Sequence, residues 1–289
     1  MKKQKLLKVG VGLVFILCCV YFSVKAFTQE PIRVLITAPE GYSERFKHSF
    51  SGSYIQPIAV PMIETEVNTN SEVILDLLSH PQEIDFIAFS SRKAVQALEK
   101  VIEQKPDIRD SLRTIKLYAV GKDADYLREV VGAGQMVMVP QEPSPAGIAN
   151  DIRLHEETDG KKIAVFVPHV EGLKEPYVVP DFIERLEDIG LQVLRCDVYT
   201  THPVESNRLQ DAVSKVEEGK IKCVAFSSSA EVDVFLNAFN EPLPQDLVIA
   251  CFGPYTTAFA KDKGLNVAIT SQDYSSFNGF VEAIESYFD

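Results

Sequence analysis

Residues 85–95, with the sequence DFIAFSSRKAV, recur in outline at residues 222–232, KCVAFSSSAEV, in the second half of the chain. The two stretches share Ala-Phe-Ser-Ser and, four residues later, Val. Each is an apolar run that ends in two serines and leads into apolar residues at helical spacing, which predicts a buried strand followed by a helix. This agreement indicates that the chain contains two similar α/β units.

A second pair of matching elements follows in the same order. The run LYAVG at residues 117–121 follows the first stretch, and IACFG at residues 249–253 follows the second. Each run is an apolar strand that ends in glycine before a helical segment. Both halves therefore carry the order strand, Ser-Ser, helix, strand, Gly, helix, which is what two similar α/β domains would give.

From residue 32 onward, short apolar runs alternate with segments of helical period. This alternation predicts parallel sheets covered by helices on both faces. Ten strands are too many for one small sheet, so we expect two sheets of about five strands each. From the residues alone, the domain split would fall near residues 159–160. The ten runs are 33–37, 54–60, 85–89, 115–120, 136–139, 163–167, 191–199, 221–226, 247–252 and 266–269.

Composition and charge exclude several classes of protein. The chain has 289 residues, of which 46% are hydrophobic and 24% charged, an ordinary globular composition that suits two domains. Its formal charge of −12 argues against nucleic acid as a partner, because such binding depends on Lys and Arg neutralising phosphates.

The N-terminal segment differs from the rest of the chain. Five lysines and no acid lie in residues 1–26. The body of the chain, residues 27–289, therefore has a formal charge of −17. Basic residues followed by an uncharged apolar run at 9–24 predict that 1–29 is a signal peptide or a membrane anchor attached through 9–24. Val24-Lys25-Ala26 suits cleavage, and a snorkelling Lys25 suits an anchor. Phe27, directly after that site, resembles the import signals of algae with complex plastids, so a plastid is expected if the source is an alga.

Cysteines and known motifs give little support for several kinds of chemistry. Cys196, Cys223 and Cys251 lack C-x-x-C spacing, and the last two lie in apolar runs that predict buried side chains. No two histidines have helical metal-ligand spacing, so we expect no metal site. The nucleotide motifs G-x-G-x-x-G and G-x-x-x-x-G-K-[ST] and the hydrolase motif G-x-S-x-G are absent from the sequence.

The repeated elements supply candidate binding groups. At the carboxyl end of a parallel strand, the free N–H groups at the start of the next helix favour anions. Hydroxyls at these corners and glycines that admit a ligand close to the backbone predict binding of carboxylate or phosphate. Helix caps and tight turns are the alternative role. The residues are Ser90, Ser91, Gly121, Ser227, Ser228 and Gly253.

Taken together, these stretches resemble the uroporphyrinogen-III synthase family over residues 32–288. The stretches that carry the resemblance are DFIAFSSRKAV (85–95), LYAVG (117–121), VLRCDVYTTH (193–202), VAFSSS (224–229) and IACFGPYTT (249–257).

The resemblance implies a domain arrangement other than a simple split. Two parallel-sheet α/β domains would be joined by a two-stranded linker, with the first strand crossing over to the C-terminal half. The first domain would comprise 30–58 and 201–289, and the second 65–192. The linker strands would be 59–64 and 193–200.

The resemblance also implies an activity. The family converts hydroxymethylbilane, a linear tetrapyrrole with eight carboxylates, into uroporphyrinogen III by dehydration and ring closure with inversion of the last pyrrole. It uses no cofactor. Tyr199 matches the family position whose phenol helps the substrate hydroxyl to depart. The substrate-binding residues implied here are Ser90, Ser91, Arg92, Gly121, Ser227, Ser228, Gly253 and Thr256.

The sequence departs from the family pattern near the first of these corners. Asp123 and Asp125 follow Gly121, where acids would repel a substrate carboxylate, whereas the cations Arg92 and Lys93 could help to hold one. A competing hypothesis is a membrane-anchored, two-lobed protein that binds small anions without catalysis. In either case we expect a monomer.

Overall fold

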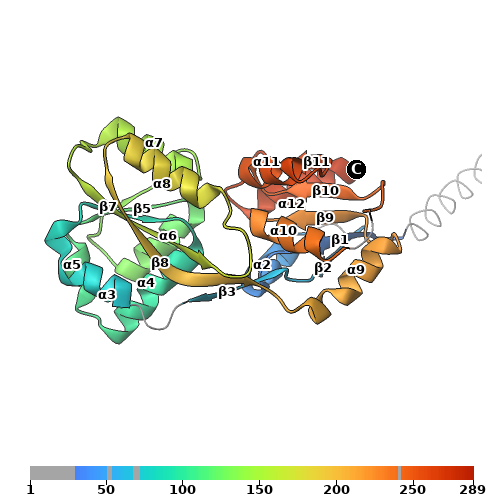
Figure 1. Ribbon diagram of the computed structural model, residues 1–289, viewed down its shortest axis with the longest axis horizontal. Coiled ribbons are helices and arrows are strands. Elements are labelled where there is room, and N and C mark those ends of the chain that lie inside the picture. The colour runs from blue at the N-terminus through green and yellow to red at the C-terminus, as the bar shows by residue number, and fades with distance from the viewer. Residues whose placement is uncertain (1–29, 51–53, 68–71, 240–241) are drawn as a thin grey trace, which may run out of the picture.

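A computed structural model describes residues 30–50, 54–67, 72–239 and 242–289 (Figure 1). Over these ranges the chain has a mixed α/β fold built on two mainly parallel sheets. The signal or anchor expected at 1–29 lies outside the described residues. Within the described ranges, no helix combines the length and apolar character needed to cross a membrane.

The smaller sheet has five strands, all parallel, in the order β11-β10-β9-β1-β2. Its first strand along the chain pairs with β9, so the N-terminal strand does cross over to the C-terminal half. This sheet and its helices are called the five-stranded lobe. The strands are β1 (Ile32–Ile36), β2 (Ile55–Ala59), β9 (Cys223–Phe226), β10 (Val248–Cys251) and β11 (Val267–Thr270).

The larger sheet has six strands in the order β3-β8-β7-β4-β5-β6 and, with its helices, forms the six-stranded lobe. All its pairings are parallel except that of β3 with β8. A split near residues 159–160 is wrong, because β7 pairs with β4 in this one sheet. The strands are β3 (Ile63–Val67), β4 (Phe86–Phe89), β5 (Lys116–Ala119), β6 (Val137–Met138), β7 (Lys162–Val170) and β8 (Gln192–Pro203).

Helices cover both faces of each sheet, and their apolar stripes form the cores. In α4, for example, Val95, Leu98, Val101 and Ile102 are buried on one face, as their spacing predicts. The helices are α2 (Glu40–Ser49), α3 (Glu72–Ser79), α4 (Arg92–Gln104), α5 (Ile108–Leu112), α6 (Gly121–Val131), α7 (Pro145–His155), α8 (Val178–Asp188), α9 (Gln210–Glu217), α10 (Ser229–Asn237), α11 (Pro254–Asp262) and α12 (Phe277–Phe288), with short 3₁₀ turns η1 (Pro81–Glu83) and η2 (Ser206–Arg208).

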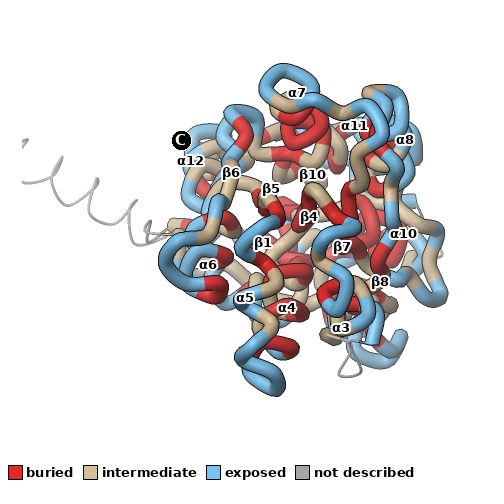
Figure 2. Tube along the Cα trace, turned by 90° about the vertical axis from the view of Figure 1, so that its left-hand side faces the viewer, coloured by how far each residue is buried: buried red, intermediate tan, exposed pale blue. Residues whose placement is uncertain are grey.

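The alternation of strand side chains divides each lobe into two cores. Leu35 of β1 packs in the core that includes residues of α9, α10 and α11, whereas its neighbours Val34 and Ile36 pack with those of α2 and α12. Figure 2 shows the same layering, with buried strands inside and exposed helix surfaces outside. Cys223 and Cys251 are free and buried, as their apolar runs predict.

Each of the ten expected strands is present within a few residues of its predicted bounds, and one further strand was missed. That strand is β3, IETEV, whose acids at alternate positions hide it from a search for continuous apolar runs. It pairs with the end of β8, with Glu64 opposite His202 and Val67 opposite Tyr199. The antiparallel ladder thus lies at 63–67 and 199–203, so it overlaps the ends of the expected linkers 59–64 and 193–200 and extends past them.

Candidate active site

The carboxyl ends of the parallel strands in both lobes open onto one pocket with a volume of about 570 Å³. Helix starts from both lobes contribute to its lining, and one face of the β3–β8 ladder closes the side between them. All nine candidate residues line this pocket. They are Ser90, Ser91, Arg92, Gly121, Tyr199, Ser227, Ser228, Gly253 and Thr256.

The first corner of the pocket is formed by Ser90 and Ser91, between the end of β4 and the start of α4. The Ser90 hydroxyl donates to the carbonyl of Phe166 at 2.8 Å. The Ser91 hydroxyl caps α4 by accepting from the Ala94 amide at 3.3 Å, and it donates to the phenol oxygen of Tyr199 at 2.9 Å. Ser91 therefore caps its helix, which is one of the two roles that the sequence left open, and it also contacts Tyr199, while anion binding by its hydroxyl stays a prediction.

The phenol of Tyr199 is held in the ladder, where its side chain is buried. Because Ser91 donates to Tyr199, the phenol accepts this hydrogen bond and keeps its own proton to donate. Burial raises the pKa of Tyr199 to about 12, so the phenol is protonated at neutral pH.

The acid and the cation at the rim of the first corner pair with each other. Arg92 lies 3.3 Å from the carboxylate of Asp123, and its guanidinium lies 4.2 Å above the ring centre of Tyr126. Burial raises the pKa of Asp123, while Arg92 acts to lower it. The expected repulsion by Asp123 is thus offset by a charge partner. Asp125 bonds to Arg128 on the exposed surface of α6.

The second corner, formed by Ser227 and Ser228 between β9 and α10, already contains a carboxylate. The Glu231 side chain accepts from the Ser227 amide at 2.7 Å and from both serine hydroxyls at 2.5 and 3.0 Å. It also accepts from the Thr37 hydroxyl at 2.6 Å. Glu231 is completely buried, and this burial raises the pKa of its carboxyl while the hydrogen bonds act in the opposite direction.

Sequence reasoning missed Glu231, although a signal was present. Serine at the N-cap followed three residues later by glutamate is the spacing of a capping box, in which the acid returns to the start of its own helix. Ser228 and Glu231 have this spacing. The serines of the second corner are therefore engaged within the protein rather than free.

The glycines Gly121 and Gly253 stand where the backbone itself borders the pocket. Gly121 begins α6 at a φ of +47°, which favours glycine. A Cβ atom at Gly253 would lie 3.3 Å from the ring of Tyr274, so this position has little room for a side chain. Among the described residues, no side chain caps the starts of α6 or α11. Pro254 has no N–H and the Asp123 amide bonds to the Val120 carbonyl, so the other first-turn amides are those available to an anion.

Further cations and phenols line the pocket, and those of α2 come from positions that the motifs did not indicate. Tyr42 and Arg45 come from α2, whereas Lys93 and Lys122 flank the first corner. Burial raises the pKa of Tyr42 and lowers the pKa of Lys93. The α2 residues were missed because α2 is far along the chain from the repeated motifs and joins the pocket only through the crossing of β1.

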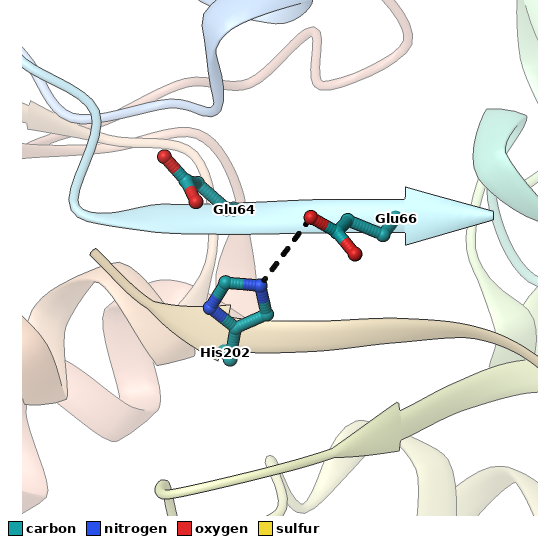
Figure 3. Close-up of side chains that lie close together, drawn as sticks. All are labelled: Glu64, Glu66 and His202. Atoms are coloured by element: carbon teal, nitrogen blue, oxygen red, sulfur yellow. Dashed lines mark ion pairs between the residues drawn. The ribbon is translucent and has the colours of Figure 1, made fainter. Parts of the chain in front are cut away.

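In the part of the chain that the structure describes, one group of side chains has the spacing of metal ligands, but it lies outside the pocket. Glu64, Glu66 and His202 come together on the β3–β8 ladder (Figure 3). Strand side chains alternate, so these residues face away from Thr65 and Tyr199, which line the pocket. Glu64 already bonds to Arg208, and His202 lies 3.9 Å from Glu66. The geometry gives this group no part in the pocket.

Comparisons with known proteins agree on one family. The family model described as Uroporphyrinogen-III synthase HemD matches residues 44–279. The uroporphyrinogen-III synthase of Chlorobaculum parvum is 25% identical over 257 residues, which cover 87% of this chain and 97% of that protein.

Two solved structures share the fold. A mutant uroporphyrinogen III synthase from Thermus thermophilus has a TM-score of 0.59 and 17% identity, covering 88% of this chain and 99% of that one. The uroporphyrinogen-III synthetase from Helicobacter pylori has a TM-score of 0.53 and 15% identity, covering 89% and 99%. At these identities the structural likeness shows the fold alone.

The contact between Ser91 and Tyr199 predicts energetic coupling between the two residues. We expect Ser91→Ala and Tyr199→Phe to be non-additive in the free energy of unfolding by about 1 kcal/mol, the usual net contribution of one hydrogen bond. Urea titration of both single variants and the double variant measures this. The control pairs Ser91→Ala with Tyr118→Phe, whose phenol bonds to Glu156 instead. Additive effects in the Tyr199 cycle would contradict the contact.

Proposed function

Because the chain belongs to the uroporphyrinogen-III synthase family, we propose that the pocket between its two lobes is where this family's reaction takes place. The activity is that of a cyclising lyase of tetrapyrrole synthesis. The observation that supports the pocket as the site is that residues from both halves of the repeat meet there, together with the ladder that carries Tyr199.

The substrate that the family implies is hydroxymethylbilane, which has eight carboxylates. Its terminal hydroxyl leaves as water, and the chain closes into a ring with the last pyrrole inverted. Since the intermediate is reactive once water has left, the protein must mainly fold the chain, orient its ends and exclude the wrong closure.

Tyr199 is the group proposed to start this reaction. The phenol donates its proton to the substrate hydroxyl as the carbon–oxygen bond breaks, so that oxygen leaves as water rather than hydroxide. The support for this role is the direction of the hydrogen bonds, because Ser91 donates to the phenol and leaves the phenol proton for an acceptor in the pocket. Ring closure releases a proton from the attacked pyrrole carbon, which restores the phenol.

Local donors must hold the carboxylates, because the body of the chain repels them at long range with a charge of −17. The exposed starts of α6 and α11 offer backbone amides, and Thr256 lies at the second of these. Arg45, Lys93 and Lys122 line the same pocket and supply positive charge.

We propose a two-domain layout, which the presence of two sheets supports. The first domain comprises 30–58 and 201–289 and the second 65–192, joined by strands in 59–64 and 193–200. Residues 1–29 are proposed as a signal peptide or anchor, and the protein acts as a monomer. The alternative of a small-anion binder without catalysis gains no support from the comparisons, which name synthases.

The product isomer tests the proposed function. The purified full-length chain is given enzymatically generated hydroxymethylbilane, and the products are oxidised and separated by chromatography. We expect isomer III in excess over isomer I, because the pocket directs the inversion. A reaction without the chain gives the spontaneous product as the control. Isomer I alone in both samples would reject the synthase activity.

Tyr199→Phe tests the proton donor. We expect turnover to fall by about 10²-fold or more, the usual contribution of a positioned general acid, while the melting temperature changes little. Tyr118→Phe is the matched control, because it also removes a buried phenol but lies outside the pocket lining. Its turnover should stay within about twofold of the original protein, since it makes no contact with the reacting groups. An unchanged rate in Tyr199→Phe would leave Tyr199 as a packing residue.

A further inference from the structure

The two corners of the repeat differ at one position that decides what each can bind. The third helical residue after the paired serines is Ala94 in the first corner and Glu231 in the second. The two residues before it are Arg92-Lys93 in the first corner and Ser229-Ala230 in the second. The same backbone arrangement therefore has two cations in one lobe and an internal acid in the other.

The second corner is a carboxylate-binding site that is already filled by a carboxyl group of the same chain, that of Glu231. Four donors converge on the Glu231 carboxyl group, at 2.5–3.0 Å, from the Ser227 amide and from the hydroxyls of Ser227, Ser228 and Thr37. Glu231 is fully buried, and the carboxyl sits within the first turn of its own helix, the end of a helix that favours anions. The donors used here are of the kind that would hold a carboxylate of the substrate.

The first corner has no such internal occupant. Ala94 has no polar side chain to return to the helix start, and it packs in the core of the six-stranded lobe. The Ser91 hydroxyl is directed to Tyr199 instead. Arg92 and Lys93 both line the pocket beside it. A carboxylate of the substrate therefore meets Lys93 and the Arg92–Asp123 pair at the first corner, where the charge of the acid is offset. At the second corner it meets donors that are already used and an acid without a cationic partner among the groups bonded to it.

We propose that Glu231 is a specificity-determining residue, whose carboxyl group fills the second corner and so prevents a substrate carboxylate from binding there. The inference rests on the proposed function of the pocket. Two duplicated corners with equal affinity would allow a linear polycarboxylate to bind in two opposed orientations. Filling one corner leaves a single orientation, in which the hydroxyl-bearing end of the substrate reaches Tyr199.

Glu231→Ala tests this inference, because it gives the second corner the residue found in the first. We expect the ratio of isomer III to isomer I to fall about tenfold, roughly the discrimination that one charge-assisted hydrogen bond provides, with a changed KM. Added acetate, which can take the vacated place, should restore the isomer ratio and raise the melting temperature of E231A, compared with chloride at equal ionic strength. Glu231→Gln, which keeps a side chain of the same shape in the corner, should recover most of the isomer ratio.

The control variant is Glu156→Ala. Glu156 is another well-buried carboxylate, bonded to Lys116 at 2.5 Å, but it lies outside the pocket lining. Its loss should lower stability without changing the isomer ratio or creating a response to acetate.

Each readout separates this inference from the proposed function. An E231A protein with the original isomer ratio and KM overturns the inference, whatever its melting temperature. An E231A protein whose melting temperature does not respond to acetate also overturns it, because the corner would then hold no carboxylate. If the unsubstituted chain forms isomer I alone, the proposed function fails, and the acetate response of E231A still reports whether the second corner is a carboxylate site.

Discussion

The antiparallel pairing of β3 with β8 is the interaction on which the pocket depends. Both connections between the lobes run through this ladder, and Figure 1 shows it crossing from one lobe to the other. The side of the ladder that faces the pocket carries Thr65 and Tyr199. The pairing register of the two strands therefore also sets the position of the Tyr199 phenol in the pocket. A shift of one residue would turn Tyr199 to the outer face, where Glu64 and His202 now lie.

Electrostatics inside the pocket are arranged locally rather than through the charge of the whole chain. Each buried acid at the pocket has its own partners, with Asp123 beside Arg92 and Glu231 among hydroxyls. The remaining cations and the exposed helix starts are therefore available to an anionic substrate. An acidic protein can in this way bind a polycarboxylate, provided that short-range donors outweigh the repulsion at long range.

Much of this arrangement could be predicted from the sequence, because a strand that leads into a helix through paired serines has a strong local signal. That signal predicted both corners and six of the candidate residues, and the family resemblance added Arg92, Tyr199 and Thr256, all of which line one pocket. β3 was missed because its sequence, IETEV, has acids at alternate positions. Such alternation fits a strand with one exposed face, but it interrupts the continuous apolar run by which the other strands were predicted. That the Glu231 carboxyl group fills the second corner could not be predicted in this way. It depends on side-chain hydrogen bonds, about which a pattern of apolar residues gives no information.

The central claim is that substrate carboxylates are held at open helix starts and not at the filled second corner. Amide hydrogen exchange, measured with and without bound uroporphyrinogen III that is kept reduced, tests this claim most directly. The account predicts slower exchange of the first-turn amides of α6 and α11, the two uncapped helix starts. It predicts no change at Ser227, whose amide already bonds to Glu231. Protection at Ser227, or unchanged exchange at both helix starts, would contradict the account.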